Sequence, residues 1–183
     1  MASILMVAGE GLPFIKTGGL ADVIGSLPQA LTERGHEVKV VMPLYKKISD
    51  KYYNELHFDC EYSVSINYHE VPVRVFSKVV DNVCFFFIQH QGYFERDSLY
   101  GYQDDGERFG YFQKAVIEML NQLNYWPNII HCHDWHTGMI PCMVKETHDA
   151  DPRYRAIRFV YTIHNMAYQG TFGPEMLDSC LGL

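Results

Sequence analysis

The stretch Lys16-Thr17-Gly18-Gly19-Leu20-Ala21-Asp22 follows an apolar run, Ser3–Ala8, and opens a segment whose apolar residues recur at helical spacing. A buried strand, a glycine-containing turn and a helix, in this order, are typical of the first unit of an α/β fold. Gly18 and Gly19 let backbone N–H groups approach a ligand, the helix presents its positive end there, and Lys16 adds a full charge. The stretch therefore predicts an anion-binding turn at the end of the first strand.

This turn matches neither of the standard nucleotide-binding fingerprints. Gly9 and Gly11 begin a Gly-x-Gly pattern, but Phe14 stands where a dinucleotide-binding loop has its third glycine. The order Lys-Thr-Gly-Gly also runs opposite to the Gly-Lys-Thr of a P-loop. We therefore expect the ligand to be held in a different way from the ligands of those two families.

Apolar runs that look like strands buried on both faces alternate with helical stretches, which is typical of a parallel α/β sheet. The predicted strands are Ser3–Ala8, Val38–Met42, Val83–Gln89, Asn128–Cys132 and Arg158–Ile163. The predicted helices are Leu20–Leu31, Asp105–Leu123 and Thr137–Thr147.

Two features modify this alternation. Gly35 ends the first helix, and Pro28 inside it implies either a kink or a fresh start near Ser26. The runs Tyr62–Ile66 and Val71–Lys78 predict an antiparallel hairpin at an edge of the sheet. The expected fold class is a Rossmann-like, mostly parallel sheet with helices on both faces and an antiparallel hairpin.

The composition bounds the class of protein. With 183 residues the chain can bury a full core, and a net charge of −7 disfavours non-specific binding to nucleic acid or to an anionic membrane. The longest apolar run, Val83–Ile88, is too short to span a bilayer, and residues 1–12 lack the pattern of a signal peptide. Five cysteines without a Cys-x-x-Cys pair indicate reduced thiols. We expect a cytoplasmic protein with no nucleic-acid or membrane partner.

The densest polar cluster, His131–Gly138, lies at the C-terminal end of the fourth predicted strand, where open parallel sheets bind ligands. Three interpretations compete. His131 and His133, on one side of the strand, could bind a metal together with Asp134, although no further ligand is evident elsewhere. Alternatively, Asp134 caps the following helix and the histidines pack structurally. As a substrate site, Asp134 would accept hydrogen bonds from sugar hydroxyls while Trp135 offers a flat apolar face.

A second cluster, Thr162–Gly170, follows the last predicted strand, with His164 and Asn165 at the strand end. Seen alone, a histidine and an amide in this position are often only turn chemistry. However, polar segments follow three strands of one predicted sheet at one edge. Together they predict a cleft with a phosphate end and a sugar end.

The long loop Gln89–Arg108 carries Tyr93 and Phe94, which could stack on sugars, although core packing is the simpler interpretation. No Gly-x-Ser-x-Gly elbow supports a nucleophilic serine. Cys132, between two histidines, is interpreted as a strand residue that faces the core.

The sequence closely resembles bacterial glycogen synthases and plant starch synthases, glycosyltransferase family 5, over essentially its whole length. The blocks that carry the resemblance, in the same order and spacing, are Lys16–Val23, Leu27-Pro28, Gly35-His36, Val41–Pro43, Tyr93–Arg96 with Leu99–Gly101, His133–Gly138 and Thr162–Gly170. The resemblance implies a GT-B fold, in which two Rossmann-like domains face each other across a cleft. It also implies transfer of glucose from ADP-glucose to the non-reducing 4-hydroxyl of an α-1,4-glucan such as glycogen, with retention of configuration and without a metal or cofactor.

By this resemblance, Lys16 and the backbone of Gly18 and Gly19 face the donor diphosphate, with Asp22 nearby. We expect Lys16 to act together with two residues on the sugar side of the cleft.

These two residues are His164, which with Asn165 would contact the donor glucose near the reacting carbon, and Asp134, which with Trp135 would lie on the sugar and acceptor side. The aromatic residues expected to border the acceptor groove are Tyr93 and Phe94.

The new helix that opens at Gly173, with no closing signal before Leu183, leads us to expect a longer protein. By the resemblance, residues 1–183 correspond to its N-terminal, acceptor-side domain. The family's second domain supplies a positively charged pair, a glutamate and most of the nucleoside pocket. Without them, we expect the chain alone to be catalytically silent. Two alternatives stay open: a non-catalytic glucan-binding module that uses Trp135, and a metal-dependent hydrolase built on His131, His133 and Asp134.

Overall fold

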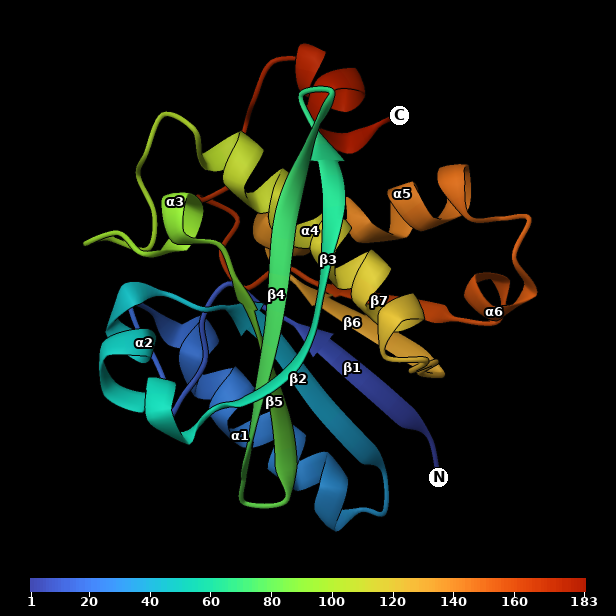
Figure 1. The fold of residues 1–183 in the computed structure, drawn as a ribbon. Helices are drawn as coiled ribbons and strands as arrows, with labels where there is room; N and C mark the ends of the chain where they lie inside the picture. The colour runs from blue at the N-terminus through green and yellow to red at the C-terminus, as the bar shows by residue number, and fades with distance from the viewer.

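A computed structural model describes residues 1–183 as one seven-stranded sheet with helices packed against it (Figure 1). The strands are β1 (Ser3–Val7), β2 (Glu37–Pro43), β3 (His57–Ile66), β4 (His69–Val80), β5 (Val83–Gln89), β6 (Ile129–His133) and β7 (Arg158–Thr162). The α-helices are α1 (Gly19–Glu33), α2 (Lys46–Tyr52), α3 (Gln91–Phe94), α4 (Asp105–Gln122), α5 (Ile140–Thr147) and α6 (Pro152–Arg155). The shorter helical turns are η1 (Tyr53–Glu55), η2 (Trp135–Thr137) and η3 (Leu177–Leu181).

The strands lie in the order β3-β4-β5-β2-β1-β6-β7. The five strands from β5 to β7 in this order are parallel, as predicted from their apolar sequences. The predicted hairpin is also confirmed, because β3 and β4 are antiparallel and β3 lies at one edge. The fold class expected from the sequence is therefore correct.

Two tight turns join β3, β4 and β5 into a meander, of which the sequence predicted only the first turn. Asn67 and Tyr68 connect β3 to β4 with φ values of 50° and 63°. Asp81 and Asn82 connect β4 to β5 with φ values of 49° and 65°. Positive φ at both central residues matches the right-handed twist of the paired strands, so the antiparallel pairing extends to β5.

Two helical connections place β2 and β6 on opposite sides of β1 in the sheet. The crossover from β1 through α1 leads to β2 on one side of β1, whereas α4 leads back across to β6 on its other side. Because such crossovers are right-handed, α1 and α4 cover opposite faces, and Figure 1 shows α1 apart from α4 and α5. The carboxyl ends of β1 and β6 therefore form the crevice at which open α/β sheets bind ligands.

The apolar core explains why most of these strands were recognisable. Leu5, Met6 and Val7 of β1 are fully buried, as are the central residues of β2 and β5. The expectation that every parallel strand is buried on both faces is wrong for β7. Val160 and Tyr161 are 43% and 45% exposed, because β7 is an edge strand with β6 as its one neighbour.

Helix boundaries differ from the sequence predictions in two places. Helix α1 runs continuously through Pro28 to Glu33, so no second helix begins near Ser26. The helix predicted at Thr137 starts at Ile140, after the separate turn η2, because Pro141 fits the first turn of a helix.

The predicted C-terminal helix is present. It ends at Leu181 and lies beside the tip of the β3–β4 hairpin (Figure 1). There the N–H of Asn67 donates to the carbonyl of Ser179 at 2.7 Å, and the Tyr68 hydroxyl donates to Asp178 at 2.8 Å.

Candidate active site

The three polar segments predicted to form a cleft follow adjacent parallel strands. Val7 at the end of β1 pairs with Cys132 in β6, and His133 pairs with Thr162 in β7. The strand ends are therefore level, and the segments that follow them start at the same edge of the sheet. Cys132 itself is fully buried, as expected, and burial raises the pKa of its thiol to about 12.

Gly9 allows the segment after β1 to pack closely against the segment after β6. A Cβ at this position would lie 2.8 Å from the Tyr100 hydroxyl and 3.1 Å from the ring of His136. The Tyr45 hydroxyl donates to the Gly9 carbonyl at 2.8 Å. Gly9, the first glycine of the Gly-x-Gly pattern, thus serves close packing.

The turn after β1 is shaped by Glu10, which the sequence analysis did not single out. Its carboxylate, 3% exposed, accepts from the Thr17 N–H at 2.5 Å, the Thr17 hydroxyl at 2.6 Å and the Gly18 N–H at 3.1 Å. The expectation that the Gly18 N–H is free for a ligand is therefore wrong, because a carboxylate of the same chain already binds it. By contrast, a Cβ on Gly19 would meet no atom within 4 Å, so this side of the turn is open.

Lys16 stands at the surface and is paired with Asp22. Its ammonium group lies 2.6 Å from the Asp22 carboxylate, and the two side chains are 47% and 53% exposed. An exposed pair of this kind contributes about 1 kcal/mol or less to stability. Lys16 can therefore exchange Asp22 for a stronger anion at little energetic cost.

Asp134 connects the segments that follow β6 and β7. Its carboxylate Oδ1 accepts the backbone N–H of His164 at 2.7 Å, and its own N–H donates to the Thr162 carbonyl at 3.0 Å. Its side chain does not cap the following turn, contrary to the structural interpretation of this cluster.

The backbone of Asp134 is strained. With φ 57° and ψ −178°, it lies in a region that residues other than glycine rarely adopt. Such strain costs about 1–3 kcal/mol and is concentrated at functional sites.

The histidines form a stacked group rather than a metal site. The rings of His131 and His133 lie 4.0 Å apart, and Nδ1 of His133 is 2.8 Å from Nε2 of His164. Burial lowers the pKa of His133 to about 3, and its two histidine neighbours act in the same direction. No three histidine, cysteine or acidic side chains are grouped as metal ligands would be. The metal interpretation therefore has no ligand set in this structure.

Trp135 is half-buried beneath the segment that follows β7. Its ring lies 5.1 Å from Phe109 and 5.5 Å from Phe172, both measured between ring centroids. Gly170, with φ 59°, passes so close that a Cβ would lie 2.3 Å from the indole. The indole is thus in part covered by the chain itself.

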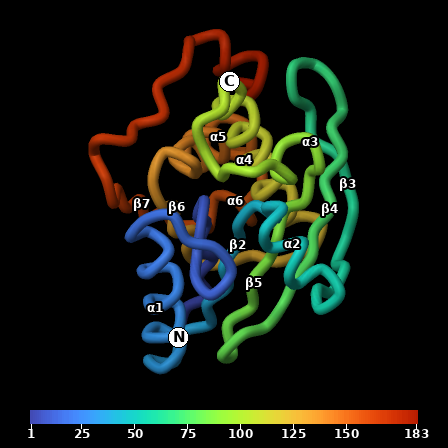
Figure 2. Tube along the Cα trace, turned by 90° about the vertical axis from the view of Figure 1, so that its left-hand side faces the viewer, coloured from blue at the N-terminus to red at the C-terminus, as the bar shows by residue number.

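The segment that covers Trp135 runs along the outside of the molecule between β7 and the C-terminal helix (Figure 2). Met166 and Tyr168 in it are 76% and 71% exposed. Asn165 is exposed, and its side-chain oxygen accepts the Ala167 N–H at 2.9 Å, which closes a local turn. The cluster thus combines the turn chemistry and the strand-end position that the sequence indicated.

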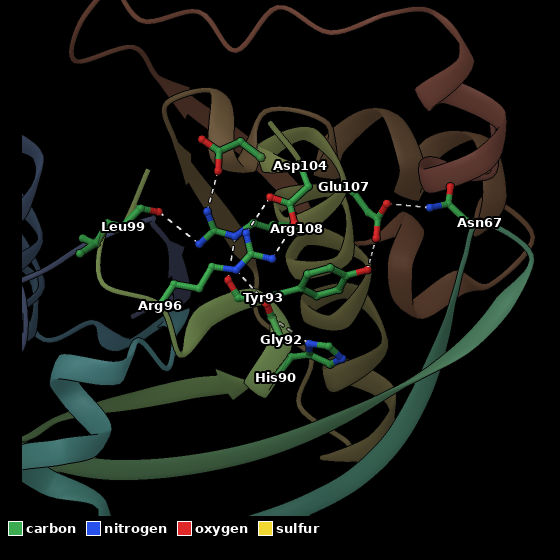
Figure 3. Close-up of polar contacts among 10 residues, drawn as sticks. Asn67, His90, Gly92, Tyr93, Arg96, Leu99, Asp104, Glu107 and Arg108 are labelled. Carbon is green, nitrogen blue, oxygen red and sulfur yellow. Dashed lines mark hydrogen bonds and ion pairs between the residues drawn. The ribbon is translucent and has the colours of Figure 1, made fainter. Parts of the chain in front are cut away.

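The aromatic loop residues Tyr93 and Phe94 occupy different environments. Tyr93 is half-buried, and its hydroxyl donates to Glu107 of α4, which also accepts from Asn67 at 2.7 Å (Figure 3). Phe94 is fully buried and packs edge-on against Tyr45. The expectation that Phe94 borders an acceptor groove is therefore wrong, and core packing is the correct interpretation for it.

Arg108 holds the loop that carries these aromatics. Its guanidinium is fully buried and donates to Asp105 at 2.5 Å. It also donates to the Tyr93 carbonyl at 2.7 Å and to the Leu99 carbonyl at 3.2 Å (Figure 3). Because both ends of the loop converge on one charged group, residues between α3 and α4 take a defined course without regular structure.

A broad open depression of about 660 Å³ lies elsewhere, beside α2, α3 and the end of β5. Its lining is mostly polar and includes Arg74, His90 and Glu95. None of the residues predicted for the active site lines it, so we place the candidate site by the strand ends rather than by this depression.

Comparison with known proteins identifies the family. The sequence model described as the starch synthase catalytic domain matches residues 3–183. The chain belongs to this family. It is 46% identical over 180 residues to a glycogen synthase of Streptococcus agalactiae, serotype III, and 43% identical over 180 residues to one of Desulforamulus reducens. Each alignment covers 98% of this chain and 38% of the relative, so the chain spans little more than a third of the length of these family members.

Two solved structures resemble the chain to different degrees. The chain superimposes on the catalytic domain of starch synthase IV from Arabidopsis thaliana, solved with ADP and acarbose, with a TM-score of 0.88 and 34% identity. All of this chain and 37% of that protein are covered. A sucrose-phosphate synthase from Thermosynechococcus elongatus, with a TM-score of 0.55 and 13% identity over 91% of this chain and 34% of the other, shares the fold alone.

Two residues of the site region were missed in the sequence, and the contact of a third was not foreseen. Glu10 had a signal, since it is an acidic residue shortly after a buried strand in an otherwise apolar stretch. No signal in the sequence indicated that Arg108 is buried, because an arginine in an amphipathic helix is normally exposed. His133 was noted as a metal ligand, but its contact with His164 depends on strand pairing that no local pattern encodes.

Proposed function

We propose that the protein to which this chain belongs transfers glucose from ADP-glucose to the non-reducing 4-hydroxyl of an α-1,4-glucan, with retention of configuration. The observation that carries this proposal is the match of the whole chain to a starch synthase catalytic domain solved with ADP and acarbose. The glycogen synthases at 46% and 43% identity support it. In this proposal the chain is the N-terminal, acceptor-side domain, residues 1–183, and a C-terminal domain binds most of the donor.

The reaction breaks the bond between the anomeric carbon and a phosphate oxygen through an oxocarbenium-like state. A diphosphate leaves readily, so the main task of the protein is to stabilise its developing charge. Lys16, which is exposed and paired only with Asp22, takes this role, and the open side of Gly19 lets the ligand approach the helix N-terminus. Gly18 acts indirectly, since its N–H holds Glu10.

The sugar end of the site is built from the segments after β6 and β7. His164 and Asn165 contact the donor glucose near the reacting carbon, and Asp134 accepts hydroxyl hydrogen bonds on the sugar and acceptor side. Its buried, strained position supports this role, because a carboxylate fixed before the ligand arrives needs no reorganisation. Trp135 and Tyr93 lie toward the acceptor.

A test of this proposal compares two lysine variants in the complete protein. Glucose transfer from ADP-glucose to a malto-oligosaccharide is measured for Lys16→Ala and for Lys47→Ala, an exposed lysine on α2. Removing one donor to the developing charge costs about 3 kcal/mol, so Lys16→Ala should lower kcat/KM about 100-fold. Lys47→Ala should leave it unchanged. Equal activities of the two variants would exclude the proposed role of Lys16.

A second test addresses the chain alone. We expect residues 1–183 to transfer no glucose, because Lys16 is a single charged donor and no second domain closes the site against water. Measurable transfer by the isolated chain would refute the two-domain proposal.

We place the protein in the cytoplasm. The structure has no helix with the length and apolar character that crossing a bilayer requires.

A further inference from the structure

His133 is completely buried, yet its ring makes only one hydrogen bond. Nδ1 lies 2.8 Å from Nε2 of His164, while Nε2 of His133 has no partner at all. The rings of the two histidines are nearly parallel, with an interplanar angle of 15° and centroids 5.1 Å apart. His164 is only half-buried, and its other nitrogen, Nδ1, makes no hydrogen bond within the chain.

A neutral pair can share this hydrogen bond in two ways. In the first, His133 carries its proton on Nδ1 and donates to Nε2 of His164, so His164 must carry its own proton on Nδ1. In the second, His164 donates from Nε2, and His133 carries its proton on the buried, unpartnered Nε2. Buried N–H groups without a partner are rarer than buried acceptors without one. The first arrangement therefore costs less.

The backbone of His164 is fixed as well as its ring. Its N–H donates to Oδ1 of Asp134 at 2.7 Å, so the last residue of β6 holds the ring of His164 and the residue after β6 holds its backbone. The one nitrogen left for a ligand is Nδ1. Which chemical group stands there, an N–H donor or a bare acceptor, follows from the proton on His133.

We propose that His133 is a positioning residue that fixes His164 in the tautomer protonated on Nδ1, so that His164 presents an N–H donor to a hydroxyl oxygen of the bound sugar. The second half of this statement rests on the proposed function, whereas the first concerns the chain by itself. Burial keeps His133 neutral by lowering its pKa to about 3, so only one of its two ring nitrogens carries a proton. His164 would then present a fixed N–H donor to a sugar hydroxyl.

The tautomers can be read directly in residues 1–183 labelled with ¹⁵N, because protonated and bare ring nitrogens differ in chemical shift. We expect both His133 and His164 to carry the proton on Nδ1 at neutral pH, while the exposed His69 shows the Nε2–H form that an unconstrained ring prefers. A proton on Nε2 of His133 would overturn the proposal, whatever the activity of the complete protein.

Two variants separate positioning from packing. In His133→Asn the amide nitrogen takes the place of Nδ1 and can still donate to His164, so His164 should keep its proton on Nδ1. In His133→Gln the amide is displaced by one bond, and His164 should revert to the mixed tautomers of a free ring. The same tautomer of His164 in both variants would refute a positioning role.

Activity of the complete protein then tests the ligand half of the proposal. Loss of one fixed neutral hydrogen bond corresponds to about a fivefold fall in kcat/KM for the sugar nucleotide in His133→Gln, with most of it regained in His133→Asn. Correct tautomers with no glucosyl transfer would refute the proposed function and leave the positioning role intact. Active enzyme with equal kcat/KM in the two variants would refute recognition through Nδ1.

Discussion

Replacing Arg108 by methionine tests the buried ion pair that organises the loop between α3 and α4. Methionine fills a similar volume without hydrogen-bond donors. The substitution leaves the carbonyls of Tyr93 and Leu99 without their partner and removes the charge beside Asp105. Asp105, which is 7% exposed, keeps one donor, the Gly101 N–H at 2.7 Å.

The magnitude follows from burial. Breaking one member of a buried ion pair costs about 3–5 kcal/mol, because the remaining charge stays desolvated. For a protein with about 5–15 kcal/mol of total stability, this is a large fraction. In the double variant Arg108→Met with Asp105→Asn no charge is left unpaired, so at least about 1 kcal/mol of the loss should be recovered.

The assay is urea unfolding of residues 1–183, with Arg96→Met as the matched control. Arg96 makes a bidentate pair with Asp104 in the same loop, at 2.7 and 2.6 Å, but both side chains are partly exposed. Its loss should cost less than about 1 kcal/mol. Equal unfolding free energies for the two single variants would refute the argument that burial decides the value of these pairs.

Other substitutions test the strand-end segments. Gly170→Ala should destabilise the chain by about 2 kcal/mol or more, since its φ is 59° and the new Cβ would meet Trp135; the measurement is thermal unfolding. Asp134→Gly should be more stable than Asp134→Ala by about 1–2 kcal/mol in urea, because both lose the carboxylate but only glycine relieves the strain. Stability should fall as the pH drops from about 6.5 toward 3. Burial lowers the pKa of His133 and of His136 to about 3, so in this range the unfolded chain binds protons at these histidines and the folded chain does not. Each contributes a slope of up to about 1.4 kcal/mol per pH unit, and His136→Gln should remove one such contribution between pH 6 and 5.

Each of these expectations has a clear contrary result. An unchanged melting temperature in Gly170→Ala would mean that the segment after β7 does not rest on Trp135. Equal stability of the two Asp134 variants would mean that the backbone there is unstrained. A pH slope that is the same in His136→Gln as in the parent chain would mean that His136 is protonated when folded.

The fold was accessible from the sequence where one local pattern decided the structure. Uninterrupted apolar runs predicted the parallel strands, and the predicted hairpin was found because its two strands are neighbours along the chain. The turn at Asp81 and Asn82 was missed, although two turn-forming residues stand between apolar runs. The exposure of β7 could not be predicted, since its sequence is as apolar as that of a central strand and only the strand order makes it an edge.

The candidate site was predictable in its location but not in its internal contacts. Strand ends brought the three polar segments together, as the sequence indicated. Which carboxylate binds which N–H was not predictable: Glu10 occupies Gly18, and Asp134 holds His164, through contacts across the turn and the sheet. The burial of Phe94 was not predictable either, because the local sequence around an aromatic residue in a loop does not indicate whether its side chain faces solvent or the core.

The two edges of the sheet differ in a way that bears on how the chain behaves in concentrated solution. On β3 most exposed positions are polar, with Phe58 as the exception, and they include Glu61, Ser63 and Ser65, which discourage pairing with another molecule. On β7 the exposed positions include Val160 and Tyr161, and the outer backbone groups of the strand have no neighbouring strand. Apart from Arg158 at its start, this edge carries no charge, and an apolar edge is a template for a strand from a second molecule. Self-association of the isolated chain should therefore begin at β7, and a lysine at position 160 would be the first substitution for keeping it monomeric.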